Sequence, residues 1–505
     1  MTGVSAHAPG PSSALGRRAA RGAVVTLGGQ GGRMVIQVVA VMILARLLDP
    51  EDYGLLAMVV VIVGIGEIFR DFGLSSAAIQ TPELSRAQRD NLFWINTAIG
   101  LTLACVLFLA SGLVAAVYDR PELTGVTQAL AGTFVLNGLA TQYRADLVRR
   151  LRFGQLALAE TAAPALALVV AILVATSGGG YWALVAQTLT QAGVILTVLV
   201  ASARWLPRLP RRAPMRGLLR FGSHLVGSQL IGYASNNVDT LLIGLRFGAG
   251  PLGYYNRAFH LLMAPLNQLR APSTTVALPV LSRLQDDPVR FGAFLQRGQL
   301  TLGYSLVAGL GVVVAAAEPV TAVFLGPKWM TVVPILRLLA VAGIFQTLAY
   351  VGYWVYLSRS LTADLMRYTL VTASIRVVCI TVGSLWGLVG VAAGYALAPA
   401  LAWPLSIWWL SRRTEIPARA LVLGALRILG ALAFSAGAAA ILVAVLVDQP
   451  ALVQLLAAAA ATIAGYALAA AAVPAVRRDV ADVVEVARLG LRRGSPRAPH
   501  TPDET

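Results

Sequence analysis

Charged side chains inside long apolar stretches are the residues of this chain whose presence most needs a chemical explanation. Glu67, Arg70 and Asp71 lie in one such stretch, and Arg33 lies in the stretch before it. Residues three and four positions apart share one face of a helix, so Glu67 faces both Arg70 and Asp71. Because the two stretches would be antiparallel neighbours, we expect Arg33 to approach the same face. Such a group either exchanges a proton or Na⁺ while an arginine is alternately paired and freed, or forms a buried ion network that fixes two helices.

The second half of the chain carries another group of polar residues in apolar sequence. Asn236, Asn237 and Asp239 lie in one stretch, and Arg257 and Arg270 lie in the next. Arginine suits phosphate because its planar guanidinium donates paired hydrogen bonds and keeps its charge, so a cavity lined by these arginines would attract a pyrophosphate group or acidic sugars. The alternative for Arg257, near the start of its stretch, is that it reaches out to the membrane surface. The predicted substrate-binding residues are Arg33, Arg70, Arg257, Arg270, Asn236 and Asn237, and the predicted ion-coupling residues are Glu67, Asp71 and Asp239.

The composition is that of a membrane-embedded chain. Hydrophobic residues make up 57% of the sequence and charged residues 12%, with a mean hydropathy of +0.73. The net charge of +17 and the pI near 10.7 would suggest nucleic-acid binding in a soluble domain. Here the arginines fall in short connections between apolar stretches, so membrane topology explains them and no nucleic-acid partner is expected.

Fourteen apolar stretches can be read between residues 22 and 474, and most reach the roughly 20 residues that a helix needs to cross a bilayer. Stretches of this length exclude a barrel, so we predict an all-α integral membrane protein. The predicted spans are 22–47, 53–80, 92–117, 123–143, 154–176, 181–203, 217–245, 252–281, 293–317, 331–357, 365–386, 389–411, 428–447 and 451–473.

The basic residues sort by membrane side. Both termini and every second connection are rich in arginine, whereas only Arg46, Arg120, Arg246 and Lys328 fall in the other connections. The positive-inside rule assigns the arginine-rich side to the cytoplasm. We therefore predict a multi-pass protein of the bacterial cytoplasmic membrane with both termini in the cytoplasm.

The chain also looks duplicated. An offset of 199 positions places Gly28 on Gly227, Gln30 on Gln229 and Gly54 on Gly253. Six spans per copy is an even number, so both copies would enter the membrane in the same direction, with a site between them at mid-depth. The predicted parts are a cytoplasmic tail (1–21), an N-lobe (22–203), a cytoplasmic linker (204–216), a C-lobe (217–411), an extra helix pair (412–474) and an amphipathic and disordered cytoplasmic tail (475–505).

No enzyme signature is present in the sequence. It has no Walker loop, no HExxH motif and only four histidines, so no cofactor or metal is expected and the chain is not predicted to be an enzyme. No element that binds ATP is visible in the sequence.

Several segments resemble a known family in the same order. They are the opening RRAARGAVVTLGGQGGRMVIQVVAVMILARLLDPEDYGLLAM, FRDFGLSSAAIQ (69–80), SNNVDTLLIGLRFGAGPLGYYNRAFHLL (235–262) and VALPVLSRLQDDPVRF (276–291). Over roughly residues 15–411 the chain is similar to polysaccharide exporters of the multidrug/oligosaccharidyl-lipid/polysaccharide (MOP) superfamily. The similarity is greatest to Wzx-type oligosaccharide flippases of the colanic-acid and teichuronic-acid exporter subgroup, often labelled lipopolysaccharide biosynthesis proteins.

The resemblance implies two six-helix lobes that alternate between inward-open and outward-open states. The implied cargo is an undecaprenyl-pyrophosphate-linked oligosaccharide, and the implied partners are membrane lipids, with a polysaccharide polymerase and glycosyltransferases as candidates. Two alternatives stay open. A drug exporter of the same superfamily would tolerate loss of the cavity arginines, and a non-transporting scaffold for glycan assembly would tolerate neutralisation of Glu67 or Arg270.

Overall fold

The computed structural model describes residues 11–71, 74, 75, 78, 84–211, 213 and 215–492, and over these residues the chain is helical without a β-strand. The predicted all-α class is confirmed. Tertiary contacts divide the chain into two compact units, unit 1 (Met1–Arg257) and unit 2 (Ala258–Thr505). Residues 1–10 of the predicted N-terminal tail and 493–505 of the C-terminal tail lie outside the described residues.

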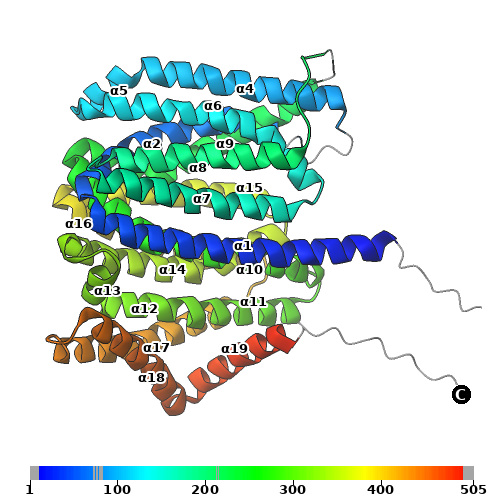
Figure 1. The fold of residues 1–505 in the computed structure, drawn as a ribbon. Coiled ribbons are helices and arrows are strands. Elements are labelled where there is room, and N and C mark those ends of the chain that lie inside the picture. Colours follow the sequence, from blue (N-terminus) through cyan, green and yellow to red (C-terminus); the bar gives the residue numbers. More distant parts are fainter. Residues whose placement is uncertain are drawn as a thin grey trace, which may run out of the picture. The chain divides into compact units, whose positions relative to one another are not determined.

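Unit 1 consists mainly of long helices whose axes lie side by side (Figure 1). Within it α7 packs against α1 and α8, and α4 packs against α6. The helices of this unit are α1 (Pro11–Leu47), α2 (Pro50–Asp71), α4 (Arg86–Leu109), α5 (Ser111–Tyr118), α6 (Glu122–Arg149), α7 (Phe153–Thr176), α8 (Trp182–Ala203), α9 (Arg216–Phe247) and the first residues of α10 (Ala249–Arg283).

Unit 2 contains the rest of α10 and the remaining helices. In it α14 packs against α16, α15 against α16 and α17 against α18, and α19 leaves the end of α18 at an angle (Figure 1). Its other helices are α11 (Pro288–Leu302), α12 (Ala308–Ala315), α13 (Ala317–Phe324), α14 (Val333–Ser358), α15 (Thr362–Gly383), α16 (Gly387–Ser411), α17 (Ala418–Val445), α18 (Ala451–Ala472) and α19 (Pro474–Arg492).

In the described residues the predicted spans coincide with helices, but most of the last nine residues of the span 53–80 lie outside that part of the chain. The number of spans is not confirmed by hydropathy. By length and composition alone, ten helical stretches of the described residues are long and apolar enough to cross a membrane, and the longest of them, Thr362–Ser411, contains both α15 and α16. Helices α6, α9 and α10 are not among the ten because their sequences are more polar. The count of fourteen therefore stays a prediction.

Small residues let the helices of unit 1 approach one another closely. A Cβ atom at Gly138 on α6 would lie 2.9 Å from the carbonyl oxygen of Asn96 on α4, and one at Gly100 would meet the backbone of Phe134. On α1, Cβ atoms at Gly29 and Gly32 would meet side chains of α7. Within a bilayer the association of helices depends on such close packing, since lipid provides no hydrophobic driving force between them.

A reciprocal contact between α2 and α10 supports the predicted repeat. A Cβ atom at Gly54 would clash with the backbone of Ala249, and one at Gly253 would clash with the backbone of Pro50. Gly54 and Gly253 differ by 199 positions, and so do Pro50 and Ala249. Exchanging each residue for its equivalent in the other repeat therefore turns the Gly54–Ala249 contact into the Gly253–Pro50 contact. Self-matching contacts of this kind arise where two equivalent elements meet about a two-fold axis.

Replacing Gly54 by alanine is expected to destabilise the protein. The added methyl group meets backbone atoms, which cannot move aside as a flexible side chain can, so α2 and α10 must separate. Overpacking of this kind costs about 1–3 kcal/mol. Thermal unfolding in detergent should show a lower Tm for Gly54→Ala. The matched control is Gly250→Ala, because a Cβ at Gly250 has nothing within 4 Å; an equal loss of Tm in both variants would contradict the close contact.

Candidate functional site

Glu67 and Arg70 form an ion pair on α2 that is completed by α6. The Nε of Arg70 lies 2.5 Å from Oε2 of Glu67, and the side-chain exposures of the two residues are 12% for Arg70 and 26% for Glu67. The amide of Asn137 donates to the other carboxylate oxygen of Glu67 at 2.9 Å, and Arg70 also donates to the Thr141 hydroxyl and to the carbonyl of Asn137. The predicted shared face of Glu67 and Arg70 is thus present, with both carboxylate oxygens and two guanidinium nitrogens hydrogen-bonded.

Arg33 and Asp71 lie outside this pair. Arg33 is exposed on α1, and no ion pair of Arg33 is found among the described residues. The expectation that Arg33 approaches Glu67 was wrong, because the glycine face of α1 packs against α7 and the carboxylate of Glu67 is taken by Arg70. Asp71 accepts a hydrogen bond of 2.6 Å from the Ser75 hydroxyl.

The polar cluster of α9 has different surroundings at each position. Asp239 is buried and accepts hydrogen bonds from the Tyr255 hydroxyl at 2.6 Å and from the Thr240 backbone NH at 2.8 Å. Asn237 donates to the carbonyl of Tyr233 one turn earlier, and Asn236 is exposed. Asp239 therefore ties α9 to the start of α10, whereas the side chain of Asn236 is exposed.

Arg257, also at the start of α10, lies over an aromatic ring. Its guanidinium carbon is 3.7 Å from the ring centroid of Tyr53 on α2, a geometry that gives cation–π attraction. Its buried Nε has no hydrogen-bond partner among the described residues. The Arg257 guanidinium is thus held by the Tyr53 ring, and its Nε remains available as a hydrogen-bond donor.

Arg270 is the most buried arginine of the predicted set and lies in unit 2. Only 5% of it is exposed, and its guanidinium donates to Gln346 at 3.2 Å and to Asn267. The ring of Tyr350 lies 5.4 Å from its guanidinium carbon, and its Nε has no partner among the described residues. We call Asn267, Gln346 and Tyr350 the Arg270 cage; it offers amide and aromatic groups to the cation but no carboxylate.

Further hydrogen bonds hold the cage in place. The Gln346 amide donates to the Tyr395 hydroxyl at 3.4 Å. The Thr274 hydroxyl donates to the Tyr350 hydroxyl at 3.0 Å and accepts from the Trp354 indole at 3.1 Å. Side chains from α10, α14 and α16 are therefore linked around one fixed positive charge.

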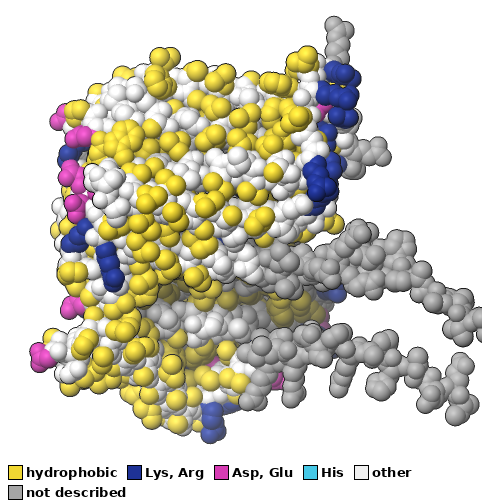
Figure 2. Space-filling view, in the orientation of Figure 1, with side chains coloured by type: hydrophobic (Ala, Val, Ile, Leu, Met, Phe, Trp, Pro, Cys, Tyr) yellow, Lys and Arg dark blue, Asp and Glu magenta, His cyan; other side chains and the backbone are white. Residues whose placement is uncertain are grey.

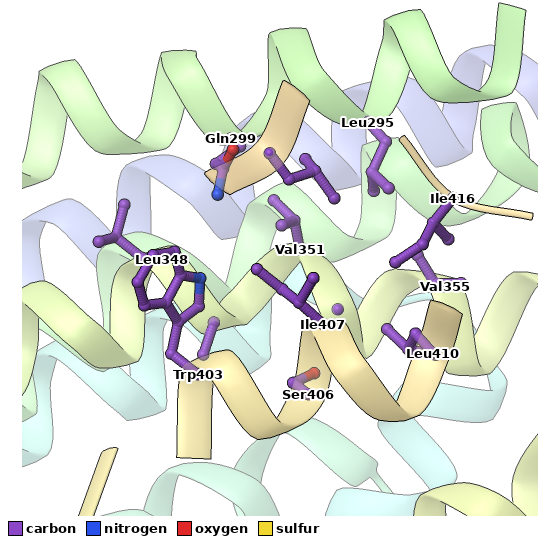
Figure 3. Close-up of a pocket in the computed structure, with 13 residues that line it drawn as sticks. Leu295, Gln299, Leu348, Val351, Val355, Trp403, Ser406, Ile407, Leu410 and Ile416 are labelled. Atoms are coloured by element: carbon purple, nitrogen blue, oxygen red, sulfur yellow. The ribbon is translucent and has the colours of Figure 1, made fainter. Parts of the chain in front are cut away.

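An enclosed cavity of unit 2 is too small to hold a cargo. It lies between α11, α14, α16 and the start of α17, has a volume of about 10 Å³, and has Gln299, Trp403 and Ser406 as polar lining (Figure 3). Neither amide atom of Gln299 nor the Trp403 indole nitrogen has a hydrogen-bond partner among the described residues. Room for about one water molecule and several unused polar atoms are the features of a buried hydration site.

Several polar groups that the structure brings together were not predicted. Asn137 and Thr141 complete the Glu67 pair from α6, and their i, i+4 spacing in an apolar helix is the signal that could have identified them. In unit 2, Arg427 on α17 pairs with Asp479 on α19 through contacts of 2.6 and 3.1 Å. Among the described residues, no group of three or more His, Cys, Asp or Glu side chains could hold a metal ion.

Replacing Asp479 by asparagine is expected to loosen α19. The carboxylate is 9% exposed and its arginine partner 26%, so the variant leaves a partly buried cation without its counter-charge. We expect a loss of about 1–3 kcal/mol, below the 3–5 kcal/mol typical of a fully buried pair. Faster hydrogen exchange across α19 would report the loss. Asp482→Asn removes the same charge at a position that forms no ion pair among the described residues, and it should leave exchange unchanged. Equal acceleration in both variants would contradict the anchoring role.

The chain matches a known protein family and is similar to proteins of polysaccharide biosynthesis. Residues 43–334 match the model of a family described as polysaccharide biosynthesis protein. The lipopolysaccharide biosynthesis protein WzxC of Escherichia coli (strain K12) is 28% identical over 60% of this chain and 63% of its own length. The teichuronic acid biosynthesis protein TuaB of Bacillus subtilis (strain 168) is 28% identical over 66% of this chain and 70% of its length. The chain thus spans less than two thirds of the E. coli relative.

Solved structures with the same fold are all-helical transporters. The lipid II flippase MurJ in an inward closed conformation superposes with a TM-score of 0.68 at 12% identity, covering 88% of this chain and 98% of that one. An inward-facing multidrug resistance MATE transporter of the MOP superfamily superposes with a TM-score of 0.57 at 14% identity, covering 79% and 99%. At these identities the likeness establishes the fold alone. Because the family model matches more than half of the sequence, the chain belongs to the polysaccharide biosynthesis protein family.

Proposed function

We propose that this protein is a flippase that carries undecaprenyl-pyrophosphate-linked oligosaccharides from the cytoplasmic to the outer face of the membrane by alternating access. The family membership and the transporter fold support transport in polysaccharide biosynthesis. The observation that carries the choice of an anionic lipid cargo is Arg270, a buried cation whose cage contains no carboxylate.

The argument from Arg270 is electrostatic. A buried charge without a counter-charge is costly in a medium of low dielectric constant, so a protein retains one where a ligand supplies the opposite charge. Pyrophosphate would satisfy the unused Nε of Arg270 through a charge-assisted hydrogen bond. Organic cations would be repelled by the same group, which favours this cargo over those of a cation exporter.

The Glu67–Arg70 pair is the proposed coupling element. The carboxylate of Glu67 is held by both the Arg70 guanidinium and the Asn137 side-chain amide. Protonation of Glu67 or binding of Na⁺ would release Arg70, and release of a cation near the cargo path would link cargo movement to an ion gradient. The alternative role of these hydrogen bonds is structural, holding α2 against α6. The double variant Glu67→Met/Arg70→Met distinguishes ion coupling from this structural role.

We further propose that the protein lies in the cytoplasmic membrane with both termini in the cytoplasm. The distribution of arginines between alternate connections supports this orientation. In unit 1, Figure 2 shows Lys and Arg gathered at the end where α4 begins, and Asp and Glu with some Lys or Arg among them at the opposite end. Reporter fusions at residues 178 and 210 should give opposite signals; the same signal from both would contradict the topology.

Depletion of the protein in its native host tests the function directly. A flippase should cause complete lipid-linked oligosaccharides to accumulate on the cytoplasmic face while surface polysaccharide falls. A scaffold for glycan assembly should instead reduce synthesis of the lipid-linked oligosaccharide itself. Polymerase and glycosyltransferases would be proximal partners in either case, so the location of the intermediate is the deciding measurement.

A further inference from the structure

A basic cleft opens in unit 1 between the start of α4 and the segment that follows α8. Its volume is about 660 Å³. Three arginines contribute to its lining, together with a tryptophan, two apolar side chains and a proline. The lining residues are Arg86, Arg204, Arg208, Trp205, Val200, Leu206 and Pro207.

The arginines of the basic cleft have no carboxylate partner among the described residues. Neighbouring arginines of unit 1 do have one, since Arg89 and Arg150 both pair with Asp146 at 3.4 and 3.0 Å. Guanidinium groups gathered around one space repel one another, and an anion between them offsets that repulsion. With no carboxylate partner for these three arginines in the described part of the chain, their charges favour an anionic ligand in the cleft.

The wall of the cleft is fixed by specific contacts. The Asn91 side chain donates to the carbonyl of Arg211 at 2.6 Å and accepts from its backbone NH at 2.9 Å. The Trp94 indole donates to the carbonyl of Arg208 at 2.9 Å. The ring of Trp205 lies 4.0 Å from the guanidinium carbon of Arg89. The segment after α8 is thus attached to α4 along its length, and its arginines are presented from a held backbone.

Apolar side chains beside these cations indicate that the ligand is a lipid. Leu206 is 72% exposed and Leu209 is 78% exposed, although both stand in a connection rich in arginine. Exposed leucines next to cations suit the boundary where lipid headgroups meet acyl chains. Trp94, itself partly exposed, is of the residue type enriched at that boundary.

We propose that the basic cleft binds the phosphate headgroup of an anionic lipid, with Leu206 and Leu209 reaching into the acyl region. The placement on the cytoplasmic leaflet rests on the proposed topology. Two sources supply the same chemistry: a bulk phospholipid such as phosphatidylglycerol, and undecaprenyl pyrophosphate, the carrier lipid of the proposed cargo.

Lipid binding by the purified full-length protein tests the proposal. Dissociation constants are measured by native mass spectrometry for dioleoylphosphatidylglycerol and undecaprenyl pyrophosphate, with phosphatidylcholine as the uncharged reference. The double variant Arg204→Gln/Arg208→Gln should weaken binding of an anionic lipid by at least about tenfold, since each arginine at a membrane surface contributes roughly 1 kcal/mol. Arg204→Lys/Arg208→Lys should retain most of the affinity.

The matched control removes the same charge elsewhere. Arg283→Gln/Arg297→Gln replaces two exposed arginines outside the cleft and should leave both affinities within about twofold. A selective loss for both lipids, or for phosphatidylglycerol alone, supports a headgroup site. A selective loss for undecaprenyl pyrophosphate alone supports it as a site for the carrier lipid. Equal losses in the cleft and control variants, or no loss in either, overturn the proposal. Binding is measured without transport, so failure of the flippase function would not alter the result.

Discussion

Replacing Arg270 by alanine is expected to lower the rate of lipid-linked oligosaccharide transport by about 10- to 100-fold. A hydrogen bond to a charged group contributes about 1.5–3 kcal/mol, and the variant removes the buried cation proposed to receive the pyrophosphate. Arg270→Lys should retain part of the rate, because it keeps the charge and loses the paired donor geometry. Initial rates in proteoliposomes, with equal amounts of inserted protein, provide the measurement.

The Tm of Arg270→Ala distinguishes a role of Arg270 in cargo binding from a role in holding α10 and α14 together. If the residue serves the cargo, its removal takes away a buried charge that lacks a carboxylate partner, so the Tm should stay the same or rise. If Arg270 instead holds α10 and α14 together through Gln346 and Tyr350, the Tm should fall. Unchanged transport in Arg270→Ala would remove the residue from the cargo site.

Neutralising Glu67 is expected to abolish the response of transport to an imposed ion gradient. Glu67→Gln keeps an acceptor for Asn137 but leaves Arg70 without its counter-charge, so this single variant should also lose about 1–3 kcal/mol of stability. The measurement compares transport rates with and without a pH or Na⁺ gradient. Loss of rate in the single variant alone would not distinguish coupling from unfolding.

The double variant Glu67→Met/Arg70→Met supplies that distinction. Apolar replacement of both members of a buried pair is often neutral or stabilising, so the protein should insert and unfold near the wild-type temperature. The proposed coupling role predicts a folded protein whose transport no longer responds to the gradient. A folded double variant that keeps the full response would assign the pair to structure alone.

The pattern of residues was sufficient to predict the helices and the contact between two charged side chains of the same helix. The apolar stretches coincide with helices because backbone groups in lipid must be satisfied within the helix itself. The Glu67–Arg70 contact followed from an i, i+3 spacing, which is a local property. The reciprocal placement of Gly54 and Gly253 agrees with an offset that was visible in the sequence.

Contacts between side chains of different helices were harder to predict from the sequence. Arg33 was expected beside Glu67 because α1 and α2 are consecutive, but the position of α1 is set by Gly29 and Gly32, which pack on α7. The contribution of Asn137 depends on which face of α6 meets α2, and periodicity does not specify that choice. Helices that are apolar on most faces give little signal about their rotation, so cross-helix polar partners emerge only from the fold.

Direct movement of a fluorescent undecaprenyl-pyrophosphate oligosaccharide across proteoliposome membranes tests the central claim. The labelled headgroup is loaded on one face, and its appearance on the other is followed by chemical quenching of the fluorophore. The account predicts movement with the wild-type protein above that of protein-free vesicles, and a rate near the protein-free value with Arg270→Ala. Wild-type protein that moves no labelled lipid, over a range of glycans and ion gradients, would contradict the flippase function.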